Sequence, residues 1–133
     1  MFGRGSKPPT TIDILIGRTA RIRGDVDFAG GLHLDGRVAG NVRAEGEAAS
    51  MLSVSEEGCI EGSVEAAHVV LNGSVRGDIY ALERLVLGPR SKVQGDVYYR
   101  VIEAALGAEI QGRLVPLREG DGQVVIEAEA AEA

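Results

Sequence analysis

The chain has 133 residues, of which 44% are hydrophobic and 26% charged, and its formal net charge is −6. Its length allows one modest hydrophobic core, and it contains neither an apolar run long enough to span a membrane nor the apolar segment of a signal peptide. A lone cysteine, Cys59, excludes an internal disulfide and fits a reducing cytoplasm. We therefore expect a single soluble domain with short tails.

The first eleven residues have no hydrophobic periodicity and are expected to form a flexible tail. They combine one large apolar side chain, Phe2, with the basic residues Arg4 and Lys7. A basic residue near an anionic membrane surface contributes about 1 kcal/mol. This composition predicts a peripheral membrane anchor, and an ordinary disordered start is the alternative that the residues leave open.

A phrase of two aliphatic residues around a central glycine recurs six times between Ile22 and Leu114. The copies span 22–26, 38–42, 60–64, 75–79, 93–97 and 110–114, with glycines at 24, 40, 62, 77, 95 and 112. A repeat of this kind indicates a solenoid, in which each unit is one structural element stacked on the next. The repeat therefore decides the architecture before any single motif does.

Apolar and polar residues alternate within each phrase, which is the period of a β-strand. Ile22 and Val26 are expected to face one side, and Arg23 and Asp25 the other. Such short strands cannot bury their apolar side alone, whereas stacked coils bury a continuous column of aliphatic side chains. The sequence predicts an all-β, single-stranded parallel β-helix of about six coils over residues 12–117.

Stacking also predicts which outward side chains become neighbours. The column after the second aliphatic residue is Asp27, Arg43, Glu65, Tyr80, Tyr98 and Val115. The column before the glycine is Arg23, Ala39, Glu61, Arg76, Gln94 and Gln111. Opposite charges become neighbours in both columns, which favours this register by tenths of a kcal/mol per exposed pair.

Two segments interrupt or follow the repeat. The longest interval between glycines, from Gly40 to Gly62, predicts a loop at residues 44–51. Residues 118–133 contain five acidic residues and end in Glu-Ala repeats. This composition predicts a disordered acidic tail, with a brief strand at residues 124–126.

An open β-helix ends in two coils whose backbone groups lack partners, and such edges are templates for another chain. The first coil offers Ile14, Ile16, Ile22, Val26 and Phe28, and the last offers Ile102, Leu106, Ile110, Leu114 and Leu117. We expect these two sets to be polymerisation surfaces. In the alternative, the tails cover them as ordinary ends of the core.

Sites for chemistry are not expected. The chain has no G-x-x-x-x-G-K-[ST] loop for a nucleotide, and His33 and His68 lie in different coils without a second metal ligand at a suitable spacing. Gly-Asp pairs occur without the calcium-binding nonapeptide. The acidic balance, with no basic face apparent in the sequence, argues against nucleic acid. No residue is assigned to catalysis, to a cofactor or to a metal.

The phrases at 20–26, 91–97 and 108–114, together with Phe2, Arg4 and Lys7, resemble the bactofilins, which are bacterial cytoskeletal proteins. The resemblance implies a right-handed β-helix with a triangular core that polymerises end to end, without nucleotide, into filaments lacking polarity. It also implies attachment to the cytoplasmic face of the membrane through the N-terminal tail. There the filaments would scaffold cell-shape or cell-wall processes, with cell-wall enzymes among the expected partners.

Two other functions remain open at this stage. Ile16, Ile22, Phe28 and Leu34 are six residues apart, as in the left-handed β-helix of hexapeptide-repeat acyltransferases. The glycine stands two residues after the aliphatic position, however, and the hexads are not kept elsewhere. The second alternative is a β-helical module that binds partners and never polymerises.

Overall fold

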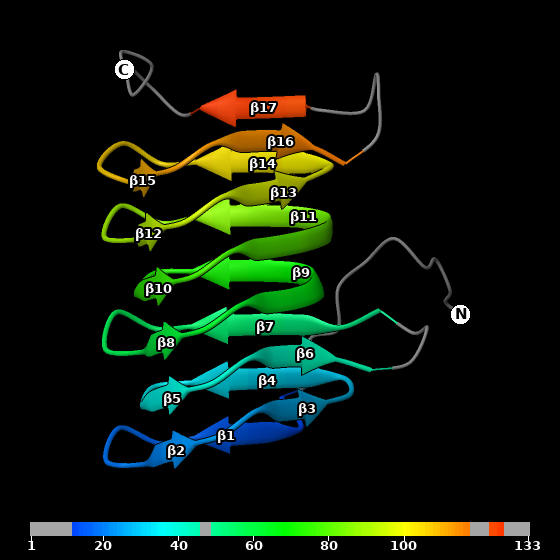
Figure 1. Cartoon of the computed structure of the whole chain (residues 1–133). Helices are drawn as coiled ribbons and strands as arrows, with labels where there is room; N and C mark the ends of the chain where they lie inside the picture. The colour runs from blue at the N-terminus through cyan, green and yellow to red at the C-terminus, as the bar shows by residue number, and fades with distance from the viewer. Residues whose placement is uncertain (1–11, 46–48, 118–122, 127–133) are drawn as a thin grey trace.

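The computed structural model describes residues 12–45, 49–117 and 123–126, and these residues form strands without any helix. The strands wind into a solenoid of about six coils (Figure 1). Every pairing between strands is parallel and joins one coil to the next. The predicted all-β parallel solenoid of about six coils is therefore confirmed.

Each coil has three strands, and each strand contributes to a different face of the solenoid. The first coil contains β1 (Ile14–Ile16), β2 (Arg21–Arg23) and β3 (Val26–Phe28), and the second contains β4 (Gly31–Leu34), β5 (Arg37–Ala39) and β6 (Val42–Ala44). The third contains β7 (Met51–Val54), β8 (Cys59–Glu61) and the start of β9 (Val64–Leu71). The fourth contains the end of β9, β10 (Ser74–Arg76) and the start of β11 (Ile79–Leu87). The fifth contains the end of β11, β12 (Lys92–Gln94) and β13 (Val97–Tyr99), and the sixth contains β14 (Val101–Ala104), β15 (Glu109–Gln111) and β16 (Leu114–Pro116).

We name the faces by their strands. The first face consists of β1, β4, β7, the ends of β9 and β11, β14 and the additional strand β17 (Gln123–Ile126). The second face is the six-stranded sheet of β2, β5, β8, β10, β12 and β15, which Figure 1 shows stacked in one column. The third face consists of β3, β6, the starts of β9 and β11, β13 and β16.

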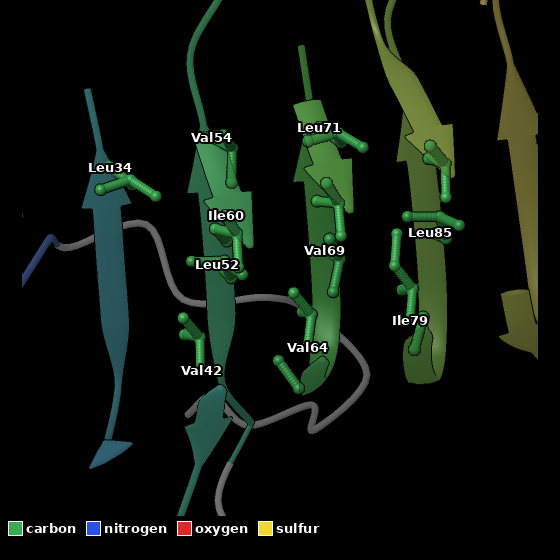
Figure 2. Close-up of a cluster of buried hydrophobic side chains, with 14 of the residues drawn as sticks. Leu34, Val42, Leu52, Val54, Ile60, Val64, Val69, Leu71, Ile79 and Leu85 are labelled. Atoms are coloured by element: carbon green, nitrogen blue, oxygen red, sulfur yellow. The ribbon is translucent and has the colours of Figure 1, made fainter. Parts of the chain in front are cut away.

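The core is a set of aliphatic columns that run along the solenoid axis. One column of register partners on the third face is Val26, Val42, Val64, Ile79, Val97 and Leu114. In the middle coils these side chains are almost fully buried, with Val64 and Ile79 both 0% exposed. Figure 2 shows Leu34, Val54 and Leu71 projecting from neighbouring strands of the first face, where they are register partners. Stacking therefore buries what one coil alone would leave exposed.

The outward columns have the predicted register. Asp27, Arg43 and Glu65 are successive partners, and Tyr80 pairs with Tyr98 further along the same column. The rings of Tyr80 and Tyr98 are stacked, with centroids 4.5 Å apart. Both predicted outward columns are confirmed, because alternation and repeat length together determine which residues meet.

The repeated glycines are required by close contact between coils. A Cβ atom added at Gly40, Gly62 or Gly77 would overlap the backbone carbonyl of the glycine in the preceding coil. The same three glycines have φ angles of 151° to 157°, which side chains rarely adopt. The central glycine of the phrase is thus a packing requirement in every coil that stacks on a preceding one.

The residue after the glycine supports the stack with its side chain. Oδ1 of Asp25 accepts a hydrogen bond from the amide of Asn41 at 2.9 Å, and Oδ1 of Asn41 accepts one from the amide of Ser63 at 2.9 Å. In the same way, Oδ1 of Asp78 accepts a hydrogen bond from the amide of Asp96 at 3.0 Å. The Gly-Asp pairs therefore bind the next coil, which explains their recurrence without a metal.

The two interruptions differ in what the structure describes. β6 ends at Ala44 and β7 begins at Met51, but residues 46–48 of the expected loop lie outside the described residues. The brief strand expected at 124–126 is confirmed within β17, which pairs with β14 along its whole length. The first face therefore has one strand more than the other two faces.

Candidate functional site

The N-terminal end of the solenoid exposes aliphatic side chains that are buried in later coils. Ile14 is 37% exposed, whereas its register partner Leu32 is 2% exposed. Ile22 and Val26 are half-buried for the same reason, because no described coil lies beyond them. Three of the predicted surface residues are therefore exposed by their position at the end of the stack.

The C-terminal end repeats this pattern on two faces. Leu114 is 43% exposed, whereas its partner Val97 is 0% exposed. Ile110 is half-buried on the second face. Leu106 and Leu117 are 56% and 37% exposed. This end therefore also presents part of a core column.

Three of the ten residues predicted for these surfaces are buried. Ile16 and Phe28 belong to the first coil and are members of the buried core, at 7% and 3% exposure. Ile102 is 1% exposed, and its register partner in β17 is Val124. The strand β17 therefore closes the edge of β14 that the sequence analysis had placed at the open end.

The structure adds two exposed residues that the sequence analysis missed. Ile12 and Leu15 are 57% and 64% exposed at the N-terminal end. Leu15 points away from the core because its neighbours Ile14 and Ile16 point toward it. The sequence indicates the exposure of Leu15, because the three consecutive apolar residues 14–16 break the alternation of a half-buried strand.

Backbone edges coincide with these apolar ends. Within the described residues, β1, β2 and β3 each pair with a strand on one side only. At the other end the same holds for β15, β16 and β17. Unpaired strand edges next to exposed aliphatic side chains are a surface on which another sheet can be added.

Arg113 gives the C-terminal end a distinct polar group. Its amide donates to Oδ1 of Asp96 at 3.1 Å, and its Nη2 atom donates to Oδ2 of the same residue at 3.0 Å. These hydrogen bonds lower the pKa of the Asp96 carboxyl below its usual value and raise that of Arg113. The last coil thus has a cation where earlier coils have an oxygen acceptor.

The two histidines have structural surroundings. His33 lies between Ser53, at 3.2 Å from its Nδ1 atom, and Asp35, at 3.0 Å from its Nε2 atom. His33 of β4 and Ser53 of β7 are register partners, and Asp35 directly follows β4. His68 is buried, and burial lowers its pKa, which favours the neutral ring.

Other candidate groups are limited by what the structure describes. No three His, Cys, Asp or Glu side chains in residues 12–45 and 49–117 lie close enough together to hold a metal ion. The described residues also contain no helix that could span a membrane. The predicted membrane anchor, Phe2, Arg4 and Lys7, lies outside the described residues.

The structure forms a basic surface that was not apparent in the sequence. Arg21 of β2 and Arg37 of β5 are register partners on the second face, and Arg23 lies on the same side of β2 as Arg21. We call Arg21, Arg23 and Arg37 the arginine patch. The expectation that the chain has no basic face is therefore wrong, because winding brings together residues that lie far apart in the sequence.

One known protein family matches most of the chain. The family model described as "Bactofilin: Polymer-forming cytoskeletal" matches residues 14–115. The matched range begins with the first residue of β1 and ends within β16, so it includes all six coils. No curated protein sequence and no solved structure gives a significant match to the chain.

Proposed function

The chain belongs to the bactofilin family of polymer-forming cytoskeletal proteins, and on this basis we propose that it assembles end to end into filaments without bound nucleotide. The filaments lack polarity and lie on the cytoplasmic face of the membrane, where they scaffold cell-shape or cell-wall processes. Its partners are further copies of itself, membrane lipids and recruited cell-wall enzymes. Its role is structural, with no catalytic residue, cofactor, nucleotide or nucleic acid.

The observation that carries this proposal is the exposure of core columns at the two ends. Leu114 is 43% exposed and Ile14 is 37% exposed, although equivalent side chains one coil inward are nearly fully buried. Complete burial of a Leu or Ile side chain stabilises by about 1.5–3 kcal/mol relative to full exposure. A second copy stacked on either end would bury these side chains and pair the free strand edges in one step.

Arg113 supports contacts between ends of the same kind. In a head-to-tail stack the amide of Asp25 in one copy would approach residue 113 of the next. At four of the five junctions between coils, this amide donates to a side-chain oxygen, that of Asp25, Asn41, Asp78 or Asp96. Arg113 has only donor groups, so it cannot continue that series. Contacts that join like ends avoid this mismatch and produce a filament without polarity.

Electron microscopy of the purified protein, without added nucleotide or metal, tests the proposal. Unbranched filaments a few nanometres wide are expected, because the apolar ends and free edges need no cofactor to associate. A field of discrete particles would contradict end-to-end assembly. Trimers in particular would favour the acyltransferase alternative, and monomers would favour a passive binding module.

The Phe2→Glu variant tests the membrane anchor separately from assembly. We expect filaments that no longer sediment with anionic vesicles, because the variant removes the apolar group that enters the headgroup region and adds a negative charge. Burial of a Phe side chain contributes about 1.5–3 kcal/mol, so binding should fall by about tenfold or more.

Ser6→Glu is the matched control, since it adds the same charge to the same tail and retains Phe2. Its binding should fall less than that of Phe2→Glu. Unchanged sedimentation of Phe2→Glu, or equal losses in the two variants, would rule out Phe2 as the anchor.

A further inference from the structure

The arginine patch places like charges next to each other on the second face. Arg21 and Arg37 are directly opposite one another on β2 and β5, at the lower end of the column in Figure 1. Like charges at directly opposed positions destabilise a sheet. The stability of the fold therefore does not account for this pair of arginines, and a binding role could.

The other charged register partners follow the opposite rule. The remaining pairs that join two charged residues are Asp27 with Arg43, Arg43 with Glu65, Glu61 with Arg76, and Lys92 with Glu109. Each of these pairs is of opposite sign, and two of them form ion pairs with N–O distances of 4.0 Å. Arg21 and Arg37 are the exception within the described register.

The arginine patch has no ion pair among the described residues. Nearby, Arg18 contacts Glu57 at 3.4 Å, whereas no acidic side chain of the described residues lies within 4.0 Å of Arg21, Arg23 or Arg37. Arg21 and Arg37 line two adjoining surface hollows of about 300 and 510 Å³, whose walls also include Glu61 in the first and Asp35 and Glu57 in the second. The guanidinium groups are therefore available to an anionic ligand.

The strands of the second face have a net charge opposite in sign to the net charge of the chain. Its strands contain Arg21, Arg23, Arg37, Arg76 and Lys92 against Glu61 and Glu109, a net charge of +3, while the chain has −6. Glu61 and Glu109 lie opposite Arg76 and Lys92, so the excess is concentrated in the arginine patch. The strands of the third face have a net charge of −1, from Asp27, Arg43 and Glu65.

We propose that the arginine patch binds the headgroups of anionic lipids and turns the second face of the solenoid toward the bilayer. The inference rests on the proposed membrane function and specifies which side of the filament meets the lipid. Guanidinium groups bind phosphate oxygens in a bidentate manner. The second face is a sheet of six three-residue strands, a regular surface that suits a planar partner.

A bilayer fits this surface better than other polyanions. The patch lies in the first two coils, close in sequence to the basic tail with Arg4 and Lys7, so both would meet the same lipid surface. In the first coil, Asp25 lies between β2 and β3, and Asp27 lies in β3. Their negative charges would repel a nucleic acid that wraps around the solenoid. The acidic segment 118–133 of another copy is a further candidate that the experiment separates.

Sedimentation with vesicles of phosphatidylcholine, with and without phosphatidylglycerol, tests the proposal on the full chain. The double variant Arg21→Gln/Arg37→Gln should bind anionic vesicles about thirtyfold more weakly. Each basic residue near an anionic surface contributes about 1 kcal/mol, and about 1.4 kcal/mol is a tenfold change in affinity. Its resistance to denaturant should not fall, since a like-charged pair is removed.

Arg76→Gln/Lys92→Gln is the matched control, because it removes two positive charges from the same face. These two residues lie opposite glutamates, so the loss of vesicle binding should be a small fraction of that in the first variant. Equal losses in the two variants would show that net charge alone determines vesicle binding, and this result would overturn the proposal.

Cys59 provides an independent readout of orientation. It is the single cysteine of the chain, half-exposed on the second face and in register with Arg37. A fluorophore on Cys59 should be quenched by brominated lipids in anionic vesicles. The same fluorophore on Ser53→Cys, in a Cys59→Ser background, lies on the first face and should be quenched less. Equal quenching at the two sites would overturn the orientation.

The outcomes separate this inference from the proposed function. If the wild type binds vesicles, Phe2→Glu does not, and Arg21→Gln/Arg37→Gln binds as the wild type does, the inference alone fails. If the wild type does not bind anionic vesicles, membrane attachment fails as well. If the double variant loses binding to DNA or to a peptide of residues 118–133, but not to vesicles, the patch belongs to that ligand and the proposal is overturned.

Discussion

Leu114→Arg abolishes filaments and leaves a folded monomer, if the C-terminal end is an assembly surface. Leu114 is the last member of a third-face column and is 43% exposed in the single chain. Stacking of a second copy would bury an unpaired guanidinium, which costs several kcal/mol. We expect the concentration needed for assembly to rise by more than about a hundredfold, measured by sedimentation and electron microscopy.

Leu82→Arg is the matched control for this variant. Leu82 is also 43% exposed, but it lies within β11 at the bend between the third and first faces, away from both ends. The same substitution at the same exposure should leave filaments intact. Filaments of Leu114→Arg, or their loss in both variants, would show that the C-terminal surface has been misplaced. Circular dichroism of each variant separates loss of assembly from loss of folding.

Gly62→Ala unfolds the solenoid or lowers its free energy of unfolding by more than about 4 kcal/mol, the range of exceptional single substitutions. The new methyl group would overlap the carbonyl group of Gly40, which is backbone and cannot rotate away. Gly40 is in turn packed closely against the backbone of Gly24 in the first coil. Several coils would therefore have to separate to remove the overlap. The loss is measured by chemical denaturation in the Leu114→Arg background, where assembly adds nothing to stability.

Two other glycines separate the causes of this loss. Gly17 has open space around its Cβ position and no left-handed φ, so Gly17→Ala should change stability by less than about 1 kcal/mol. Gly24 has a φ of 129° but nothing within 4 Å, so Gly24→Ala should show only the strain, about 1–3 kcal/mol. A loss in Gly62→Ala no greater than that in Gly24→Ala would contradict the contact between coils.

The exposure of side chains at the two ends was predicted only in part. Ile14 and Leu114 could be assigned because they are the first and last members of columns that the repeat defines. Phe28 belongs to the first coil but is 3% exposed, as a member of the buried core. Ile102 is 1% exposed for a different reason, because β17 pairs with β14 along its edge. A repeat pattern does not reveal where a segment outside the repeat will dock.

The sequence by itself determined the solenoid, its register and the members of its columns. A glycine phrase with alternating neighbours allows one stacking order, so Tyr80 had to meet Tyr98 and Glu61 had to meet Arg76. Tertiary structure alone decided which members of a column are exposed and where β17 pairs with the solenoid. The physical reason is that alternation and repeat length are local properties of the chain. Exposure and the field of neighbouring charges depend on residues brought together only when the coils stack.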